Sequence, residues 1–343
     1  MLRAKKPLVS CVLILAAAAV PAFANLIIIP TFASSIASDP NAAAIEGTIN
    51  SAIGIYEADI ATPITVNITY QESGGLGGSA FALFTVPYVG FYAALKASAT
   101  SANDAIALAR LAEDGTGVDN PVTGTDTVLI KPANALALGF GFGPGGPPAS
   151  DGTISLNTSI TTPGSPGSTG AYNLLPVVEH ETDEILGLGS TLGLGLNSPF
   201  NDDPSPEDFF RFDASGHRSF TSSGVGQAFF SLNGTTDLDQ FDNQNDGGDF
   251  GDWQSNPLPP VPQVQDAFAT PGSDPSLGVE LTALDAIGYT LTAQGATPEP
   301  AYWVATALVL LALLLIRRRL TGQGWSRPTA STNGAVKRAV SLD

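Results

Sequence analysis

Apolar segments at both ends of the chain limit the part that can fold as a globular domain to the residues between them. Residues 1–24 have a basic start, an apolar stretch from Leu8 to Val20 and a small-residue motif that ends at Ala24. This order is typical of a secretory signal peptide, and the apolar stretch is too short to span a bilayer stably. We expect signal peptidase to cleave after Ala24, which removes Cys11, the only cysteine.

A second segment covers residues 297–319. The triplet Pro-Glu-Pro ends at Pro300, an apolar run covers 301–316, and three arginines follow it. An apolar helix with a cationic end keeps that end in the cytoplasm. The arrangement resembles the PEP-CTERM sorting signal, which implies transient anchoring in the inner membrane and processing by an exosortase-type enzyme. Residues 320–343 would then be a cytoplasmic tail. An ordinary single-pass anchor is the alternative.

The residues between these segments are strongly acidic. The full chain has a net charge of −18, and every acidic residue except Asp343 lies between residues 25 and 300. That span has few basic residues, namely Lys96, Arg110, Lys131, Arg211 and Arg218. A surface of this charge repels phosphate backbones, which argues against nucleic acid as a partner. It suits an extracellular protein that holds divalent cations.

Strands and helices alternate in the first half of this span. Apolar and alternating patterns predict strands over 26–32, 64–70, 127–130 and 152–157. Helical spacing predicts helices from Pro40, over 95–111 with a cap near Ser101 or Asn103, from Ala171, and over 277–291. The stretch 74–78 is rich in glycine, and 188–275 has the composition of loops. We therefore predict an α+β fold over 25–295, with an N-terminal part over about 25–187 and a C-terminal part over about 188–295.

The helix from Ala171 carries the sequence His180-Glu181-Thr182-Asp183-Glu184. His180 and Glu184 are one helical turn apart on the same face, so both side chains can reach one metal ion. Glu181 lies about 100° around the helix, where a carboxylate can take a proton from water beside the ion. The spacing predicts a metal site with Glu181 as general base. A solvated helix face is the alternative.

This motif resembles the His-Glu-x-x-His motif of zinc peptidases, with Glu184 in place of the second histidine. Leu-Gly-x-Gly-Ser follows it and ends at Ser190, and the segments 208–212 and 247–253 accompany it. Together they make residues 26–290 similar to a bacterial group of metzincin-like zinc metalloproteases. The resemblance implies a small twisted mixed sheet with two or three helices above a loop-rich C-terminal subdomain. It also implies a Zn²⁺ cofactor and a protein or peptide substrate.

The third metal ligand stays open. Metzincins carry it where this chain has Ser190, whose hydroxyl is a poor zinc ligand, and the Met-turn of that family is absent. His217 is the only other histidine, and we take it as the candidate third ligand. Asp208 and Asp213 are rival ligands, and a surface-loop histidine is the alternative interpretation of His217.

An acidic cluster follows in the second half, formed by Asp242, Asp246, Asp249 and Asp252. Its spacing is partly that of a calcium loop. It departs from the EF-hand because Trp253 stands at the twelfth position, where a bidentate glutamate belongs. A Ca²⁺ loop of another type and a polar loop anchored by Trp253 are the two interpretations.

Taken together, these features predict an exported zinc-dependent endopeptidase at the cell surface or outside the cell, which hydrolyses peptide bonds with metal-activated water. The alternative is a non-catalytic surface or matrix protein that keeps a metalloprotease fold. The carboxylate in place of the second histidine and the absent Met-turn favour this alternative. Whether a third ligand lies close to His180 and Glu184 separates the two hypotheses.

Overall fold

The described residues belong to one compact unit of the chain, Met1–Ala296. In this computed structural model they are 25–114, 117–142, 148–164, 170–196, 203–222 and 226–293. The predicted signal peptide (1–24), the sorting segment (297–319) with its apolar helix (301–316), and the tail (320–343) lie outside them. Across the described residues, no helix is long and apolar enough to cross a membrane.

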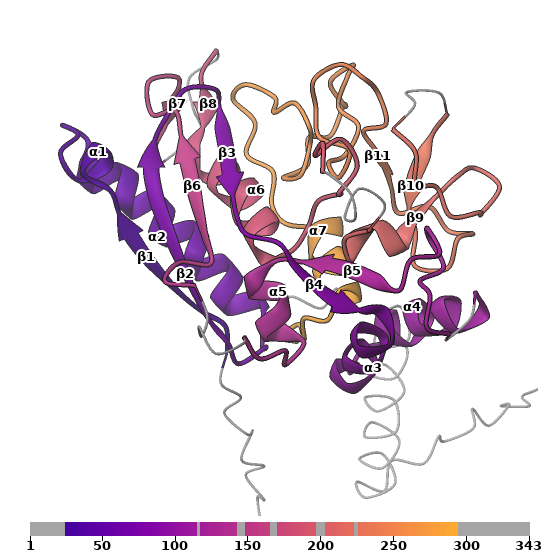
Figure 1. Cartoon of the computed structure of the whole chain (residues 1–343). Coiled ribbons are helices and arrows are strands. Elements are labelled where there is room, and N and C mark those ends of the chain that lie inside the picture. Colours follow the sequence, from indigo (N-terminus) through magenta and orange to yellow (C-terminus); the bar gives the residue numbers. More distant parts are fainter. Residues whose placement is uncertain are drawn as a thin grey trace, which may run out of the picture. The chain divides into compact units, whose positions relative to one another are not determined.

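A four-stranded mixed sheet forms one side of this unit (Figure 1). Its strand order is β1 (Ile27–Phe32), β2 (Thr65–Glu72), β6 (Gly152–Leu156) and β3 (Gly77–Ala80). The first three strands are parallel, and β3 is antiparallel at the edge. Side chains alternate between the two faces of a strand, which is why Val66, Ile68 and Tyr70 are all buried. The strands predicted over 26–32, 64–70 and 152–157 are confirmed.

Two helices, α2 (Ala42–Asp59) and α6 (Leu174–Leu186), lie side by side against this sheet (Figure 1). Helix α2 buries Ile45, Ile49 and Ile53, which recur every four residues and so share one face. The hydroxyl of Tyr56 donates a hydrogen bond of 2.7 Å to the backbone carbonyl of Glu179. Helix α2 therefore holds α6 in place through both apolar packing and a buried polar contact.

Strand β3 differs from the sequence prediction, which placed a loop over 74–78. Gly77 and Gly78 belong to the strand and pair with β6. A Cβ atom at Gly77 would overlap Oε1 of Glu181, so glycine lets this strand approach α6 closely. The side-chain pattern of this glycine-rich stretch does not indicate a strand, because the pairing with β6 depends on backbone groups only.

The first half contains further helices and short strands. They are α1 (Ser34–Ala37), β4 (Phe84–Pro87), α3 (Tyr88–Ser98), α4 (Ala102–Glu113), β5 (Thr127–Ile130), α5 (Pro132–Ala137), β7 (Thr161–Thr162) and β8 (Tyr172–Asn173). The single helix predicted over 95–111 is wrong, because α3 and α4 are separate helices. Ser101 starts α4 through a capping box with Asp104, so the predicted cap becomes a new helix start rather than part of a longer helix.

Loops dominate the second half, as predicted for 188–275. Its regular elements are the 3₁₀ turn η2 (Glu207–Phe210), the antiparallel strands β9 (Arg211–Phe212), β10 (Ala228–Phe230) and β11 (Asp239–Phe241), and helix α7 (Val279–Ala286). Aromatic rings organise it: Trp253 lies 5.6 Å from Phe230 and 5.2 Å from Phe241, centroid to centroid. The described residues thus form an α+β protein with several small sheets, which confirms the α+β part of the prediction.

Candidate metal centre

Helix α6 presents His180, Glu181 and Glu184 from a firmly held position. The helix ends at Gly187, whose positive φ of 139° favours glycine. The hydroxyl of Tyr289 donates a hydrogen bond of 2.6 Å to the carbonyl of Leu186 in the last turn. Because hydrogen bonds join both the middle and the end of α6 to other elements, the backbone positions of its site residues are fixed.

A second segment, Gly247–Trp253, brings Asp252 to this helix. Trp253 is fully buried, and its indole Nε1 donates a hydrogen bond of 3.1 Å to Glu280 of α7. A Cβ atom at Gly251 would overlap the backbone of Gly189 and Ser190. The segment therefore lies directly against the turn that follows α6, and Asp252 faces the helix.

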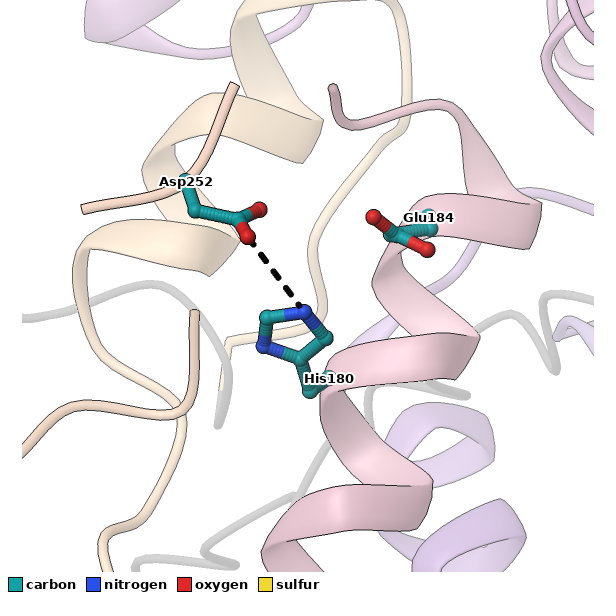
Figure 2. Close-up of side chains that lie close together, drawn as sticks. All are labelled: His180, Glu184 and Asp252. Atoms are coloured by element: carbon teal, nitrogen blue, oxygen red, sulfur yellow. Dashed lines mark ion pairs between the residues drawn. The ribbon is translucent and has the colours of Figure 1, made fainter. Parts of the chain in front are cut away.

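Three side chains from these two segments point toward one another, as Figure 2 shows. One ligand atom each from His180, Glu184 and Asp252 lies within 4.8 Å of the other two. The imidazole Nε2 of His180 is 3.7 Å from Oδ2 of Asp252. Its Nδ1 lies 3.0 Å from the carbonyl oxygen of Val264, which can only accept, so Nδ1 carries the proton. In the neutral imidazole, Nε2 then has a free lone pair for a metal ion.

Outer contacts orient the two carboxylates. The hydroxyl of Ser79, on strand β3, donates a hydrogen bond of 2.5 Å to Oε2 of Glu184. The side-chain amide of Gln265 donates one of 2.9 Å to Oδ1 of Asp252. Such outer partners are usual around metal ligands, where they fix the ligand orientation.

The charges of the cluster call for a cation. Burial lowers the pKa of His180, but the carboxylates of Asp252, Glu181 and Glu184 outweigh burial and raise it to about 10. Burial raises the pKa of Asp252 to about 7, against the opposing effect of His180. In the absence of a metal ion, the raised pKa values mean that His180 and Asp252 bind protons where an ion could otherwise supply the positive charge. A donor set of one imidazole nitrogen and two carboxylate oxygens can hold a divalent cation.

Glu181 lies beside this group without being part of it. Its side chain is 5 % exposed, and its Oε2 atom is buried without a hydrogen-bond partner. Burial is the main cause that raises its pKa to about 8. A carboxyl group with a raised pKa next to candidate metal ligands is suited to exchange protons near neutral pH.

A cavity of about 290 Å³ opens in front of these residues. Strand β3 and helix α6 line one side of it, and the segments 247–252 and 263–275 line the other. His180, Glu181, Glu184 and Asp252 all contribute to its wall, together with Val177. The candidate metal ligands are therefore accessible from a cavity large enough for part of a ligand.

The structure places the other predicted ligands away from this group. The side chain of His217 is 80 % exposed, and its Nδ1 lies 3.5 Å from Oδ2 of Asp213. Asp208 accepts hydrogen bonds from Ser190 and Thr191, in the turn after α6, and from Ser205. Asp208 thus fastens that turn, and the third residue that lies with His180 and Glu184 is Asp252.

The four aspartates of the predicted calcium cluster fall into two pairs: the carboxyl groups of Asp242 and Asp246 share a hydrogen bond, and Asp249 lies near enough to Asp252 for its charge to raise the pKa of Asp252. Among the described residues, the group of three that could hold a metal ion takes only Asp252 from this cluster. Oδ1 of Asp242 accepts a hydrogen bond from the backbone of Gln244, and Oδ2 of Asp246 accepts one of 2.9 Å from the amide of Asn256. The sequence grouped Asp252 with the other three aspartates, whereas in the structure it lies with His180 and Glu184. The Gly251-Asp252-Trp253 triplet was the sequence signal that could have indicated this position of Asp252. Gly251 lets the backbone approach Gly189 closely, and the buried ring of Trp253 anchors the segment.

Comparison with protein-family models, with curated proteins and with solved structures finds no match to this chain. The site itself therefore carries the functional conclusion. It can hold a divalent cation through His180, Glu184 and Asp252, with one further carboxylate, Glu181, facing the same cavity.

Proposed function

We propose that the chain is a zinc-dependent endopeptidase that hydrolyses peptide bonds with metal-activated water. The observation that supports this most is the position of Asp252, which supplies a third ligand close to His180 and Glu184. Three protein ligands beside an open cavity are typical of catalytic zinc sites, because they leave a position for water or substrate. Structural zinc sites instead use four protein ligands.

In this proposal His180, Glu184 and Asp252 hold the zinc ion, which acts as a Lewis acid on the peptide carbonyl and on water when bound. Glu181 is the proton acceptor. Its pKa of about 8 belongs to the metal-free protein, and a nearby divalent cation favours the charged carboxylate and lowers that pKa. Glu181 then accepts a proton at neutral pH and returns it to the leaving amine.

The edge of the sheet favours an extended peptide as substrate. Among the described residues, β3 pairs with β6 on one side only, and Gly77, Gly78 and Ser79 of this strand line the cavity. Backbone groups on the free side of an edge strand can pair with an added strand. The antiparallel edge strand, the helix beneath it and the loop-rich second half also support a metzincin-like arrangement, which we include in the proposal.

Export is the second part of the proposal. It depends on the signal-peptide pattern of residues 1–24 and on the PEP-CTERM-like segment over 297–319. The expected partners are signal peptidase, an exosortase-type sorting enzyme and a protein or peptide substrate. The expected location is the cell surface or the medium, after a transient stay in the inner membrane.

One observation favours the alternative of a non-catalytic surface protein that keeps the fold. Two of the three candidate ligands are carboxylates, and anionic ligands reduce the Lewis acidity of the ion relative to neutral imidazole. Such a site would hold zinc firmly without activating water well. A measurement of peptide hydrolysis distinguishes the peptidase from the non-catalytic surface protein.

The decisive variant is Glu181→Gln in the full chain, assayed with zinc on unfolded protein substrates. The amide keeps the shape of the side chain but cannot accept a proton. We expect unchanged folding and zinc content, with peptide hydrolysis lower by about 10²–10⁴-fold. Glu113→Gln is the matched control, because its side chain is 70 % exposed on α4. If the wild type shows no hydrolysis that Glu181→Gln abolishes, the non-catalytic function takes the place of the enzyme.

A further inference from the structure

The cavity in front of the candidate metal centre has acidic side chains in its wall and no basic side chain to offset them. Among the described residues that line it, neither lysine nor arginine occurs, and the carboxyl groups belong to Glu181, Glu184, Asp249, Asp252 and Asp266. A divalent cation held by the candidate centre would offset the charges of Glu184 and Asp252. Asp249 and Asp266 have neither a ligand nor a catalytic role in the proposed function, so their charges face the cavity without a partner in its wall.

Asp266 carries an unsatisfied oxygen atom in this wall. The residue is 3 % exposed, and its Oδ2 accepts a hydrogen bond of 3.0 Å from the backbone N–H of Gln263. Its Oδ1 is buried and has no hydrogen-bond partner among the described residues. A buried carboxylate oxygen without a donor is costly, so a group that brings a donor into the cavity gains from binding there. Ammonium and guanidinium groups are donors that also carry the opposite charge.

Asp249 and Asp266 lie on the same side of the cavity. They belong to the segments 247–252 and 263–275, which lie across the cavity from β3 and α6. A peptide that pairs with the free edge of β3 would lie between these two walls. The side chains of an extended peptide alternate between its two faces, so one set of them would face the wall that contains the two aspartates.

We propose that Asp249 and Asp266 form a subsite that selects substrates with a lysine or arginine side chain near the scissile bond. The inference deepens the proposed peptidase function and rests on it. A cleft lined by charges of one sign attracts the opposite charge. Asp266 offers a buried acceptor to the cationic group, and the exposed Asp249 adds a second charge. Burial raises the pKa of Asp266 to about 7, so at pH 8 its carboxyl group is mainly ionised, and a bound cation favours the charged form further.

The test compares two pools of short unstructured peptides of uncharged residues, which differ only in a central lysine or a central glutamine. The zinc-loaded full chain cleaves both pools at pH 8, and mass spectrometry of the products at low peptide concentration gives the ratio of the two kcat/KM values. We expect this ratio to favour the lysine pool by about tenfold in the wild type, as for a hydrogen bond between charged groups.

The ratio should fall in Asp249→Asn and in Asp266→Asn, and come close to one when both changes are combined. The amide oxygen of Asp266→Asn can still accept the hydrogen bond from Gln263, and if that variant does not fold, Asp249→Asn decides. Asp249→Lys should reverse the selection in favour of a pool with a central glutamate. Asp119→Asn, in an exposed loop, is the matched control and should keep the wild-type ratio. The zinc content of each variant is measured as well, so that loss of metal is not taken for loss of selection.

Peptide binding distinguishes a failure of this inference from a failure of the peptidase. The zinc-loaded Glu181→Gln chain binds fluorescently labelled peptides of the two pools, and fluorescence anisotropy gives the two Kd values. Tighter binding of the lysine pool without hydrolysis by the wild type supports the subsite and refutes the peptidase. Equal hydrolysis and equal binding of the two pools overturn the subsite and leave the peptidase intact. A preference that Asp119→Asn lowers as much as Asp249→Asn belongs to the acidic surface as a whole, and that result also overturns the subsite.

Discussion

Asp252 is a candidate metal ligand that the local sequence pattern does not indicate. Its Oδ1 accepts a hydrogen bond of 2.9 Å from Gln265, which leaves Oδ2, at 3.7 Å from His180 Nε2, to face the site. The carboxylate is thus held by one oxygen and free to bind through the other. Carboxylate ligands are commonly oriented in this way by a hydrogen bond to one oxygen, and their substitution strongly lowers metal affinity.

Asp252→Asn should therefore strip the site of zinc. The amide has almost the same shape but no charge, and we expect zinc affinity to fall by at least about 100-fold, comparable to the loss in His180→Ala. Chelator competition or elemental analysis of the purified chain measures this. His217→Ala is the control, because that side chain is 80 % exposed and paired with Asp213. Equal zinc loss in His217→Ala would return His217 to the ligand set.

At the scale of elements, helices α4 and α7 meet through two acidic side chains. Asp104 caps α4, and Asp285 of α7 is 1 % exposed and accepts a hydrogen bond of 2.7 Å from the Ser101 hydroxyl. Burial raises the pKa of Asp285, and the negative charge of Asp104 raises it further, to about 7. The folded protein therefore holds a proton here that the unfolded chain releases above its ordinary pKa of 3.8.

The sign of the resulting pH dependence is opposite to that of a paired surface carboxylate. Because the folded-state pKa is raised, the contribution of Asp285 to stability is full below pH 4 and is lost as the pH rises toward 7. Asp285→Asn removes that loss. Its free energy of unfolding should exceed that of the wild type by about 2–4 kcal/mol more at pH 8 than at pH 4.

Urea titrations of the wild type, Asp285→Asn and the exposed-loop control Asp119→Asn at these two pH values measure the effect. The control should follow the wild type at both values. An advantage of Asp285→Asn that is the same at pH 4 and pH 8 would show that Asp285 is already ionised in the folded protein.

At the scale of the whole molecule, the candidate metal centre joins the two halves of the fold. His180 and Glu184 come from the helix that packs on the four-stranded sheet, and Asp252 comes from the loop-rich half. An ion bound by all three cross-links segments that are otherwise joined by packing around Trp253 and α7. Binding to the folded state alone stabilises it, because the unfolded chain does not assemble the site.

Zinc should therefore raise the melting temperature of the full chain, and a chelator should reverse the change. At a free zinc concentration of about 100 times Kd, the expected stabilisation is ~2.7 kcal/mol. Differential scanning calorimetry with and without zinc measures it, and His180→Ala is the control that should not respond. An equal response in that variant would place the stabilising zinc on the acidic surface rather than in the candidate centre.

The local features of this fold were accessible from the sequence. Alternating residues predicted β2. The helical spacing of apolar residues, together with the four-residue spacing of His180 and Glu184, predicted α6 and its two candidate ligands. These properties depend on neighbours within one or two turns, so the pattern of side chains is sufficient. Local patterns failed at β3 and at the break between α3 and α4. Backbone pairing with β6 forms a strand where the glycine content predicted a loop, and the cap at Ser101 starts a new helix where the apolar spacing predicted one continuous helix.

The third candidate ligand and the position of the buried Lys131 were decided by tertiary structure alone. Asp252 reaches His180 because Trp253 is anchored on Glu280 and because Gly251 lets two backbones meet at Gly189. Lys131 reaches the same turn from an element that lies before α6 in the chain. Contacts between residues so far apart in sequence arise from the packing of the whole core. No local periodicity encodes them, which is why the sequence predicted His180, Glu181 and Glu184 and only the fold brought Asp252 to them.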